Sequence, residues 1–125
     1  MSGLAELKET YVTADTLDIE LEGWMAEVAP FQWREPRPFQ PEASALLVVD
    51  MSRPFIEVGY PMASPSAPAI VARLAEVAAA FRAAGRPVIW IVQGHHALEY
   101  DRGAKLAAWW PTMFQEGTPD VELAT

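Results

Sequence analysis

The chain contains two uninterrupted apolar segments separated by a segment of helical periodicity. The apolar segments cover residues 45–49 and 87–92. A continuous apolar run of this length is typical of a strand buried on both faces, as in a parallel sheet. Residues 67–84 place apolar side chains at three- and four-residue steps, which predicts an amphipathic helix. Ser66 is the expected N-cap of this helix, and Gly85 is the expected residue just after its end.

The order of these elements determines where candidate functional residues lie. A strand, a helix and a second strand form a right-handed crossover unit, so the two strands are expected to run parallel. Their carboxyl ends then lie at one edge of the sheet, where α/β proteins bind ligands. Asp50 follows the first strand, and Gln93, His95 and His96 follow the second. The topology therefore predicts an α/β fold in which Asp50 lies in a cleft near these side chains. On local grounds alone, Asp50 is either a helix N-cap or a functional carboxylate.

Residues 1–42 have a different pattern and are expected to form a separate arm before the domain at 43–125. Apolar and acidic residues alternate from Leu17 to Glu22, which predicts a short strand or an extended arm with one buried face. Aromatic residues and four prolines follow, and these prolines exclude a long helix or a central strand there. The arm is expected to pack on the domain or on another subunit. The alternative is that Trp24, Phe31 or Trp33 forms a wall of a substrate pocket.

Composition narrows the class of protein. The 125 residues predict one domain, and half of them are apolar, which is enough for an ordinary core. The net charge of −8 disfavours nucleic acid or an anionic membrane as a partner. The chain has no Cys, so it contains no disulfide, thiolate metal site or cysteine nucleophile. No apolar run has the length of a membrane span, and the N-terminus has no signal-peptide pattern, so a cytoplasmic protein is expected.

Five features along the chain occur in a characteristic order. Residues 45–50 are followed by Phe55, the alanine-rich helix at 67–84, the strand at 87–92 and the segment Glu116-Gly117-Thr118-Pro119-Asp120-Val121-Glu122-Leu123. This ordered set resembles the isochorismatase-like cysteine hydrolase superfamily, which includes nicotinamidases and the carbamoylsarcosine and ureidoacrylate amidohydrolases. The resemblance covers about residues 43–125. It implies a Rossmann-like parallel sheet with flanking helices in three layers, of which this chain supplies the N-terminal portion.

The resemblance also implies a mechanism. In the family an aspartate, here Asp50, ends the first strand and takes the proton from a cysteine thiol, while a lysine neighbours both groups. A thiol with a pKa of about 8.5 is mostly protonated at neutral pH, so it needs such a base. The expected reaction is hydrolysis of a C–N bond in a small amide or ureido compound through a thioester acyl-enzyme, with no cofactor. The lysine and the cysteine lie downstream of the Gly-Thr-Pro segment in the family, and this chain stops before either. We therefore expect them on a C-terminal portion or a second chain, and we expect a homo-oligomer of the assembled unit.

Departures from the family pattern leave the substrate open. Many members have Gln-Asn-Asp where this chain has Ser52-Arg53-Pro54, in a loop that borders the family's active site. Arg53 either binds a substrate carboxylate or is solvated, and the solvated state is favoured. The residues expected to contact the substrate are Phe55, His95, His96 and Trp109.

A metal site is not expected. Nicotinamidase-type members place an Asp-x-His metal motif after the second strand, where this chain has Gln93-Gly94-His95. His95 and His96 are adjacent, and adjacent side chains on a strand point to opposite sides. A pocket-lining hydrogen-bonding role for His95 or His96 is therefore favoured over zinc binding.

Two other classes of function remain as alternatives. A chain with one of three catalytic residues is also consistent with a catalytically inactive binding subunit or pseudoenzyme. A doubly wound nucleotide binder ranks last, because the chain has neither a G-x-G-x-x-G motif nor a P-loop. Lys105 precedes the Gly-Thr-Pro segment and is interpreted as a surface charge. By itself, such a chain is expected to expose a large apolar surface.

Overall fold

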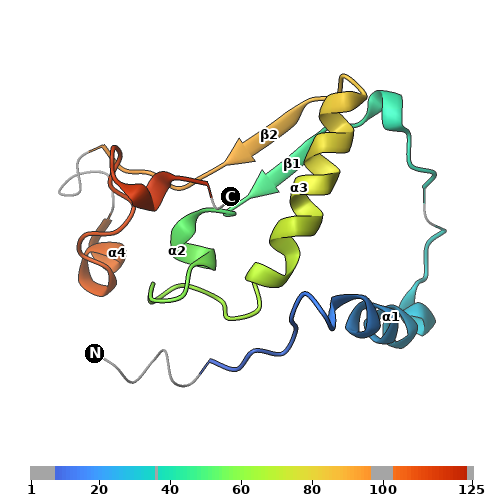
Figure 1. Cartoon of the computed structure of the whole chain (residues 1–125), viewed down its shortest axis with the longest axis horizontal. Helices are drawn as coiled ribbons and strands as arrows, with labels where there is room; N and C mark the ends of the chain where they lie inside the picture. Colours follow the sequence, from blue (N-terminus) through green and yellow to red (C-terminus); the bar gives the residue numbers. More distant parts are fainter. Residues whose placement is uncertain (1–7, 36, 97–102, 124–125) are drawn as a thin grey trace.

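Two parallel strands and one long helix form the centre of the structure (Figure 1). The computed structural model describes residues 8–35, 37–96 and 103–123. Strands β1 (Leu46–Val49) and β2 (Val88–Ile91) pair in parallel, with Leu46 opposite Val88 and Val49 opposite Ile91. Helix α3 (Pro68–Ala83) connects them. Both predicted strands, the helix between them and the α/β fold class are confirmed.

The two ends of α3 have different local causes. Pro68 occupies the first helical position, where a missing N–H costs nothing because that group has no partner in a helix. At the other end Gly85 adopts a φ of +65°. Its N–H donates to the Arg82 carbonyl, and the Arg86 N–H donates to the Phe81 carbonyl. This is a Schellman motif, so Gly85 ends the helix as predicted.

The expected N-cap role of Ser66 is wrong. The N-cap residue is Ala67, and no side chain caps the helix there. Ser66 is buried, and its Oγ accepts hydrogen bonds from the backbone N–H groups of Tyr11 and Val12, at 3.0 and 3.2 Å. The hydroxyl therefore attaches the N-terminal segment to the domain, a role that depends on residues 54 and 55 positions away in the sequence.

The two faces of the sheet have different environments. Val48 is buried on the face of the sheet that packs against α3. The alternate residues point to the other face, where Leu47 and Val49 remain 55% and 50% exposed and Ile89 and Ile91 remain 48% and 44% exposed. The expectation that these strands are buried on both faces is therefore wrong for this chain, because the described residues form a layer on only one face. The expected exposure of a large apolar surface is confirmed.

The N-terminal arm contains a helix where the alternating pattern predicts a strand. Helix α1 (Leu17–Val28) continues into a short 3₁₀ turn, η2 (Ala29–Phe31). A strand at residues 17–22 would need a pairing partner, and the described part of the chain places none beside it, whereas a helix satisfies its own backbone. Figure 1 shows α1 set apart from the sheet, at the end of an extended linker. The main side-chain connection between α1 and α3 is an exposed ion pair of Asp18 with Arg73, at 2.9 Å.

The C-terminal segment returns to the carboxyl ends of the strands. The short helix expected before Pro111 is present as α4 (Gly103–Trp109), and the surface turn expected at 116–123 contains a 3₁₀ turn, η4 (Pro119–Val121). Residue Leu123 bridges Ser52 in the antiparallel sense, and Gln115 bridges His95 in the parallel sense. A helix long and apolar enough to cross a membrane is absent from the described residues.

Candidate active site

Asp50 lies at the carboxyl end of β1, as the topology predicts. Its N–H donates to the carbonyl of Ile91 at 3.0 Å, which continues the parallel ladder by one residue. Its φ of +59° lies in the left-handed region, which is uncommon for a residue other than glycine. Such strain, of order 1–3 kcal/mol, persists where the surrounding structure determines the conformation.

The expectation that the Asp50 side chain lies in a cleft is not met in this chain. Asp50 is exposed to solvent. It follows Val49, whose side chain belongs to the uncovered face of the sheet. The described residues supply one wall at this position, so the carboxylate lies on an open surface.

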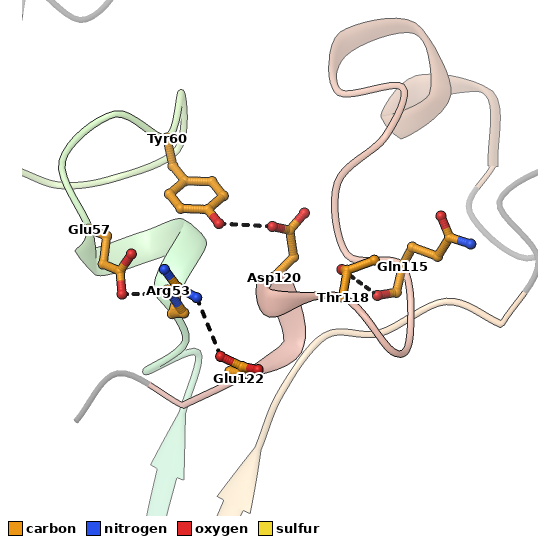
Figure 2. Close-up of polar contacts among 7 residues, drawn as sticks. All are labelled: Arg53, Glu57, Tyr60, Gln115, Thr118, Asp120 and Glu122. Atoms are coloured by element: carbon orange, nitrogen blue, oxygen red, sulfur yellow. Dashed lines mark hydrogen bonds and ion pairs between the residues drawn. The ribbon is translucent and has the colours of Figure 1, made fainter.

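The loop after Asp50 forms a short helix, α2 (Arg53–Ile56), that is held by ion pairs (Figure 2). The Nε of Arg53 donates to Glu57 at 2.6 Å, and its Nη1 lies 3.3 Å from a carboxylate oxygen of Glu122. The hydrogen bond to Glu57 raises the pKa of Arg53 above its ordinary value. The guanidinium is therefore engaged by two carboxylates of the protein while it remains partly exposed to solvent. The backbone supports the same contact, since the Arg53 N–H donates to the Glu122 carbonyl.

Asp120 joins three segments of this region. One carboxylate oxygen accepts a hydrogen bond from the Tyr60 hydroxyl at 3.0 Å, and the other accepts one from the Phe114 N–H at 3.1 Å (Figure 2 shows the first of these). The bond to Asp120, together with desolvation, raises the pKa of Tyr60 above its ordinary value. Phe114 is 1% exposed and has a φ of +64°, and its carbonyl accepts from the His95 N–H at 2.8 Å. The backbone of Phe114 is left-handed, and its N–H donates to Asp120 while its carbonyl accepts from His95, which follows β2.

The two histidines after β2 lie in different surroundings. His95 is half-buried, and its Nε2 lies 3.3 Å from the side-chain amide nitrogen of Gln93. His96 is exposed, and its Nδ1 lies 2.5 Å from a carboxylate oxygen of Glu116. The backbone of His95 also accepts a hydrogen bond from the Glu116 N–H at 3.0 Å. Glu116 therefore contacts the side chain of His96 and the backbone of His95.

Phe55 and Trp109 lie on different structural elements. Phe55 is half-buried in α2, and its ring packs against Phe114 with 5.5 Å between centroids. Trp109 is 64% exposed at the end of α4 and meets Trp110 edge to face at 5.6 Å. The two tryptophans line a mostly apolar cavity of about 660 Å³, together with Lys8, Pro61, Met62 and Ala108. This cavity is large enough for a small molecule.

Ser52 has an unusual environment two residues after Asp50. Its side chain is completely buried, and its Oγ has no hydrogen-bond partner among the residues that the structure describes. A buried hydroxyl without a partner costs about 1–3 kcal/mol. Ser52 is also the residue that bridges Leu123, so this orphaned hydroxyl lies at the junction between the Asp50 loop and the C-terminal segment.

The described residues contain no group of three or more His, Cys, Asp or Glu side chains that is arranged to hold a metal ion. The whole chain has no Cys. Lys105 is exposed on α4, and its Nζ lies 5.9 Å from the centroid of the Trp109 ring. Its position therefore agrees with its interpretation as a surface charge.

Sequence reasoning missed the carboxylates that hold this region together. The i, i+4 spacing of Arg53 and Glu57 is a recognised signal for a helical ion pair. Asp120 and Glu122 had no such local signal, because their partners Tyr60 and Arg53 lie 60 and 69 residues away.

Comparison with known proteins identifies the class. Residues 44–125 match the family model of the isochorismatase domain. Because this match covers more than half of the sequence, the chain belongs to the isochorismatase domain family.

One solved structure is similar to this chain. It is a cysteine hydrolase from Pseudomonas syringae pv. phaseolicola 1448A, with a TM-score of 0.61 and 25% sequence identity. The similarity covers 71% of this chain and 43% of the solved chain, so this chain spans less than half of that protein's length. No curated protein matches the sequence. The resemblance to isochorismatase-like cysteine hydrolases is confirmed.

Proposed function

We propose that this chain provides the aspartate-bearing part of a cysteine-dependent amidohydrolase. The substrate would be a small amide or ureido compound, and the bond cleaved would be a C–N bond. The observation that carries the proposal is the position of Asp50, at the carboxyl end of a parallel strand in an isochorismatase domain and next to an uncovered apolar sheet face. A carboxylate at this edge of an α/β sheet is well placed for catalysis.

The proposed mechanism needs a nucleophilic cysteine and a lysine in addition to Asp50. The chain has no Cys, and Lys105 lies on α4 with its ammonium toward Trp109. We propose that a C-terminal portion or a second polypeptide supplies the nucleophilic cysteine and the lysine. The same portion would cover the sheet face formed by Leu47, Val49, Ile89 and Ile91, because an apolar surface of this kind is stabilised by a second layer. That layer would also supply the wall of the cleft that Asp50 lacks.

The proposed reaction has two steps. Asp50 takes the thiol proton as the thiolate sulfur attacks the carbonyl carbon, and backbone N–H groups stabilise the oxyanion. The C–N bond breaks, the amine leaves with the proton from Asp50, and a thioester remains. Water then attacks the thioester with Asp50 as the base, which releases the acid and restores the thiol.

The candidate substrate-binding residues come from α2, from the segment after β2 and from α4. We propose that Phe55, His95, His96 and Trp109 contact the substrate. His95 and His96 carry hydrogen-bonding groups near the strand ends, and Trp109 borders the cavity of about 660 Å³. No cofactor enters this mechanism.

The test uses the chain alone and together with a polypeptide that carries the cysteine and the lysine. The combined sample should release amine or ammonia from small amides or ureido compounds, and intact mass should detect an acyl adduct on the cysteine. Asp50→Asn should nearly abolish turnover with folding retained. Asp15→Asn, at an exposed turn before α1, is the matched control and should leave turnover unchanged.

Two results would contradict this function. Near-normal turnover by Asp50→Asn would remove Asp50 from the mechanism. A monomeric, cooperatively folded and active chain without any second portion would exclude the two-part enzyme. The exposed position of Asp50 and the absence of Cys favour one alternative, an inactive isochorismatase-like binding subunit. That alternative predicts substrate binding without turnover in the combined sample.

A further inference from the structure

Lys8 is the one charged residue among the described side chains that line the cavity beside Trp109. The other lining residues are apolar or aromatic and belong to two segments, 61–62 and 108–110. These segments follow β1 and β2 in the chain, and Figure 1 shows α2 and α4 beyond the carboxyl ends of the two strands. The cavity therefore lies at the end of the sheet where α/β proteins bind ligands, the same end as Asp50.

The ammonium of Lys8 is held in place by backbone groups. Its Nζ donates to the carbonyl oxygens of Pro61 and Ala63, at 2.8 and 2.6 Å. Further along the same segment, two backbone N–H groups donate to the Oγ of Ser66, and the side chain of Val12 is buried. The segment that carries Lys8 is therefore fixed at two points to the loop between α2 and α3, so the position of the ammonium is defined before a ligand binds.

The positive charge of Lys8 has no carboxylate partner in the described part of the chain. Both of its acceptors are neutral carbonyl oxygens, and an ammonium has three N–H donors, so one donor and the charge are available to a ligand. Beside it, Trp109 and Trp110 meet edge to face with 5.6 Å between centroids, and Trp109 is 64% exposed. Indole rings provide a large apolar surface for a flat group.

We propose that this cavity binds a small organic carboxylate that also carries an aromatic group. The carboxylate lies on the ammonium of Lys8, and the aromatic group packs against Trp109 and Trp110. A hydrogen bond between an ammonium and a carboxylate is about twice as strong as one between neutral groups, so the carboxylate is preferred over an uncharged acceptor. In so far as this rests on the proposed function, the substrate is an amide or ureido compound with a free carboxylate.

The source of the ammonium gives the arm a role in specificity. The family match covers residues 44–125, so Lys8 lies outside the common domain. The described residues of the domain supply the apolar and aromatic walls of the cavity, and the arm supplies its charge. The preference for a carboxylate is therefore a property that the arm adds to the domain.

Binding is measured on the 125-residue chain with benzoate, benzamide and acetate as probes. Benzoate carries both groups, whereas benzamide lacks the charge and acetate lacks the ring. Benzoate should therefore bind at least about fivefold more tightly than either. The site is located in a proton–nitrogen NMR correlation spectrum from the indole N–H signals of the five tryptophans. Benzoate should shift the signals of Trp109 and Trp110, which Trp109→Phe and Trp110→Phe assign.

Two lysine variants test the role of the charge. Lys8→Gln removes the charge and keeps side-chain N–H groups for the loop carbonyls. It should weaken benzoate binding about tenfold and affect benzamide far less. Lys105→Gln is the matched control, because Lys105 is the other lysine of the chain, changes the net charge equally, and has its Nζ 5.9 Å from the centroid of the Trp109 ring. It should change benzoate binding less than twofold.

Three results would overturn the site. The first is equal binding of benzoate and benzamide by the unchanged chain. The second is a loss of benzoate binding in Lys105→Gln as large as that in Lys8→Gln. The third is an equal loss of benzoate and benzamide binding in Lys8→Gln with an unchanged circular dichroism spectrum, because Lys8 would then shape the loop without binding the carboxylate.

Turnover separates this site from the enzymatic proposal. In the sample completed with the cysteine and the lysine, Lys8→Gln should raise the KM for para-carbamoylbenzoate about tenfold relative to the KM for para-methylbenzamide. Turnover without benzoate binding would overturn the site and leave the amidohydrolase function standing. Benzoate binding at Trp109 and Trp110 without turnover would support the site and count against the enzymatic function.

Discussion

Replacing Asp120 by Ala should destabilise the chain far more than replacing an exposed acid. Asp120 accepts hydrogen bonds from the Tyr60 hydroxyl and from the N–H of Phe114, which is 1% exposed. A hydrogen bond to a charged acceptor contributes about 1.5–3 kcal/mol, and a buried N–H left without a partner costs about 1–3 kcal/mol. Because Asp120 is half-buried, we take the low end of each range and expect a loss of about 2.5 kcal/mol for Asp120→Ala.

Single variants separate the two contacts. Tyr60→Phe removes only the hydroxyl and should cost about 1.5 kcal/mol. The free energy of unfolding is measured by urea titration with tryptophan fluorescence, and a double-mutant cycle of Tyr60→Phe with Asp120→Ala gives the coupling. Asp15→Ala is the matched control and should change stability by no more than about 0.5 kcal/mol.

The pH dependence gives an independent check on the same pair. The pKa of Tyr60 is raised in the folded chain by its hydrogen bond to Asp120. A group whose pKa is raised by folding contributes stability that is complete below its unfolded pKa of about 10 and disappears as the pH rises through the folded value. The difference in stability between the wild-type chain and Tyr60→Phe should therefore be full at pH 8 and shrink above pH 10. An Asp120→Ala variant as stable as Asp15→Ala, or a Tyr60→Phe difference that is constant through this range, would refute the reasoning.

Three further predictions concern the loop after β1. Ser52→Ala removes a buried hydroxyl that has no partner in the described part of the chain, so urea titration should show unchanged or increased stability, by up to about 2 kcal/mol; a loss above about 1 kcal/mol would mean that the hydroxyl is satisfied. Asp50→Gly relieves a left-handed backbone and should stabilise the chain by about 0.5–1 kcal/mol, and a loss of stability would show that the Asp50 side chain itself holds the loop. Arg53→Met should lower the stability more at low salt than at 1 M salt, because Glu57 and Glu122 are partly exposed; a loss that does not depend on salt would contradict an ionic origin.

Local sequence signals determined the central crossover unit. The apolar runs at 45–49 and 87–92 predict β1 and β2 because few other elements bury such short continuous segments. Gly85 and Pro87 predict the end of α3 because a left-handed glycine and a residue without an N–H both stop a helix. The parallel pairing of the two strands, and hence the position of Asp50 at their carboxyl ends, follows from chain order and handedness alone.

The tertiary structure decided the features that depend on partners distant in the sequence. The alternation at residues 17–22 predicts a strand, but no described strand pairs with it, so the backbone forms the self-sufficient helix α1. Serine is a common helix N-cap residue, which is why the sequence predicts that role for Ser66. Its hydroxyl instead accepts hydrogen bonds from two backbone N–H groups of the N-terminal segment. The contacts of Arg53 and Asp120, and the exposure of Asp50, are determined by which segments fold next to them. The local sequence predicts helix and strand periodicity and the residues that form turns. Contacts between side chains that are 60 residues apart, such as Tyr60 and Asp120, depend on how the segments pack in three dimensions.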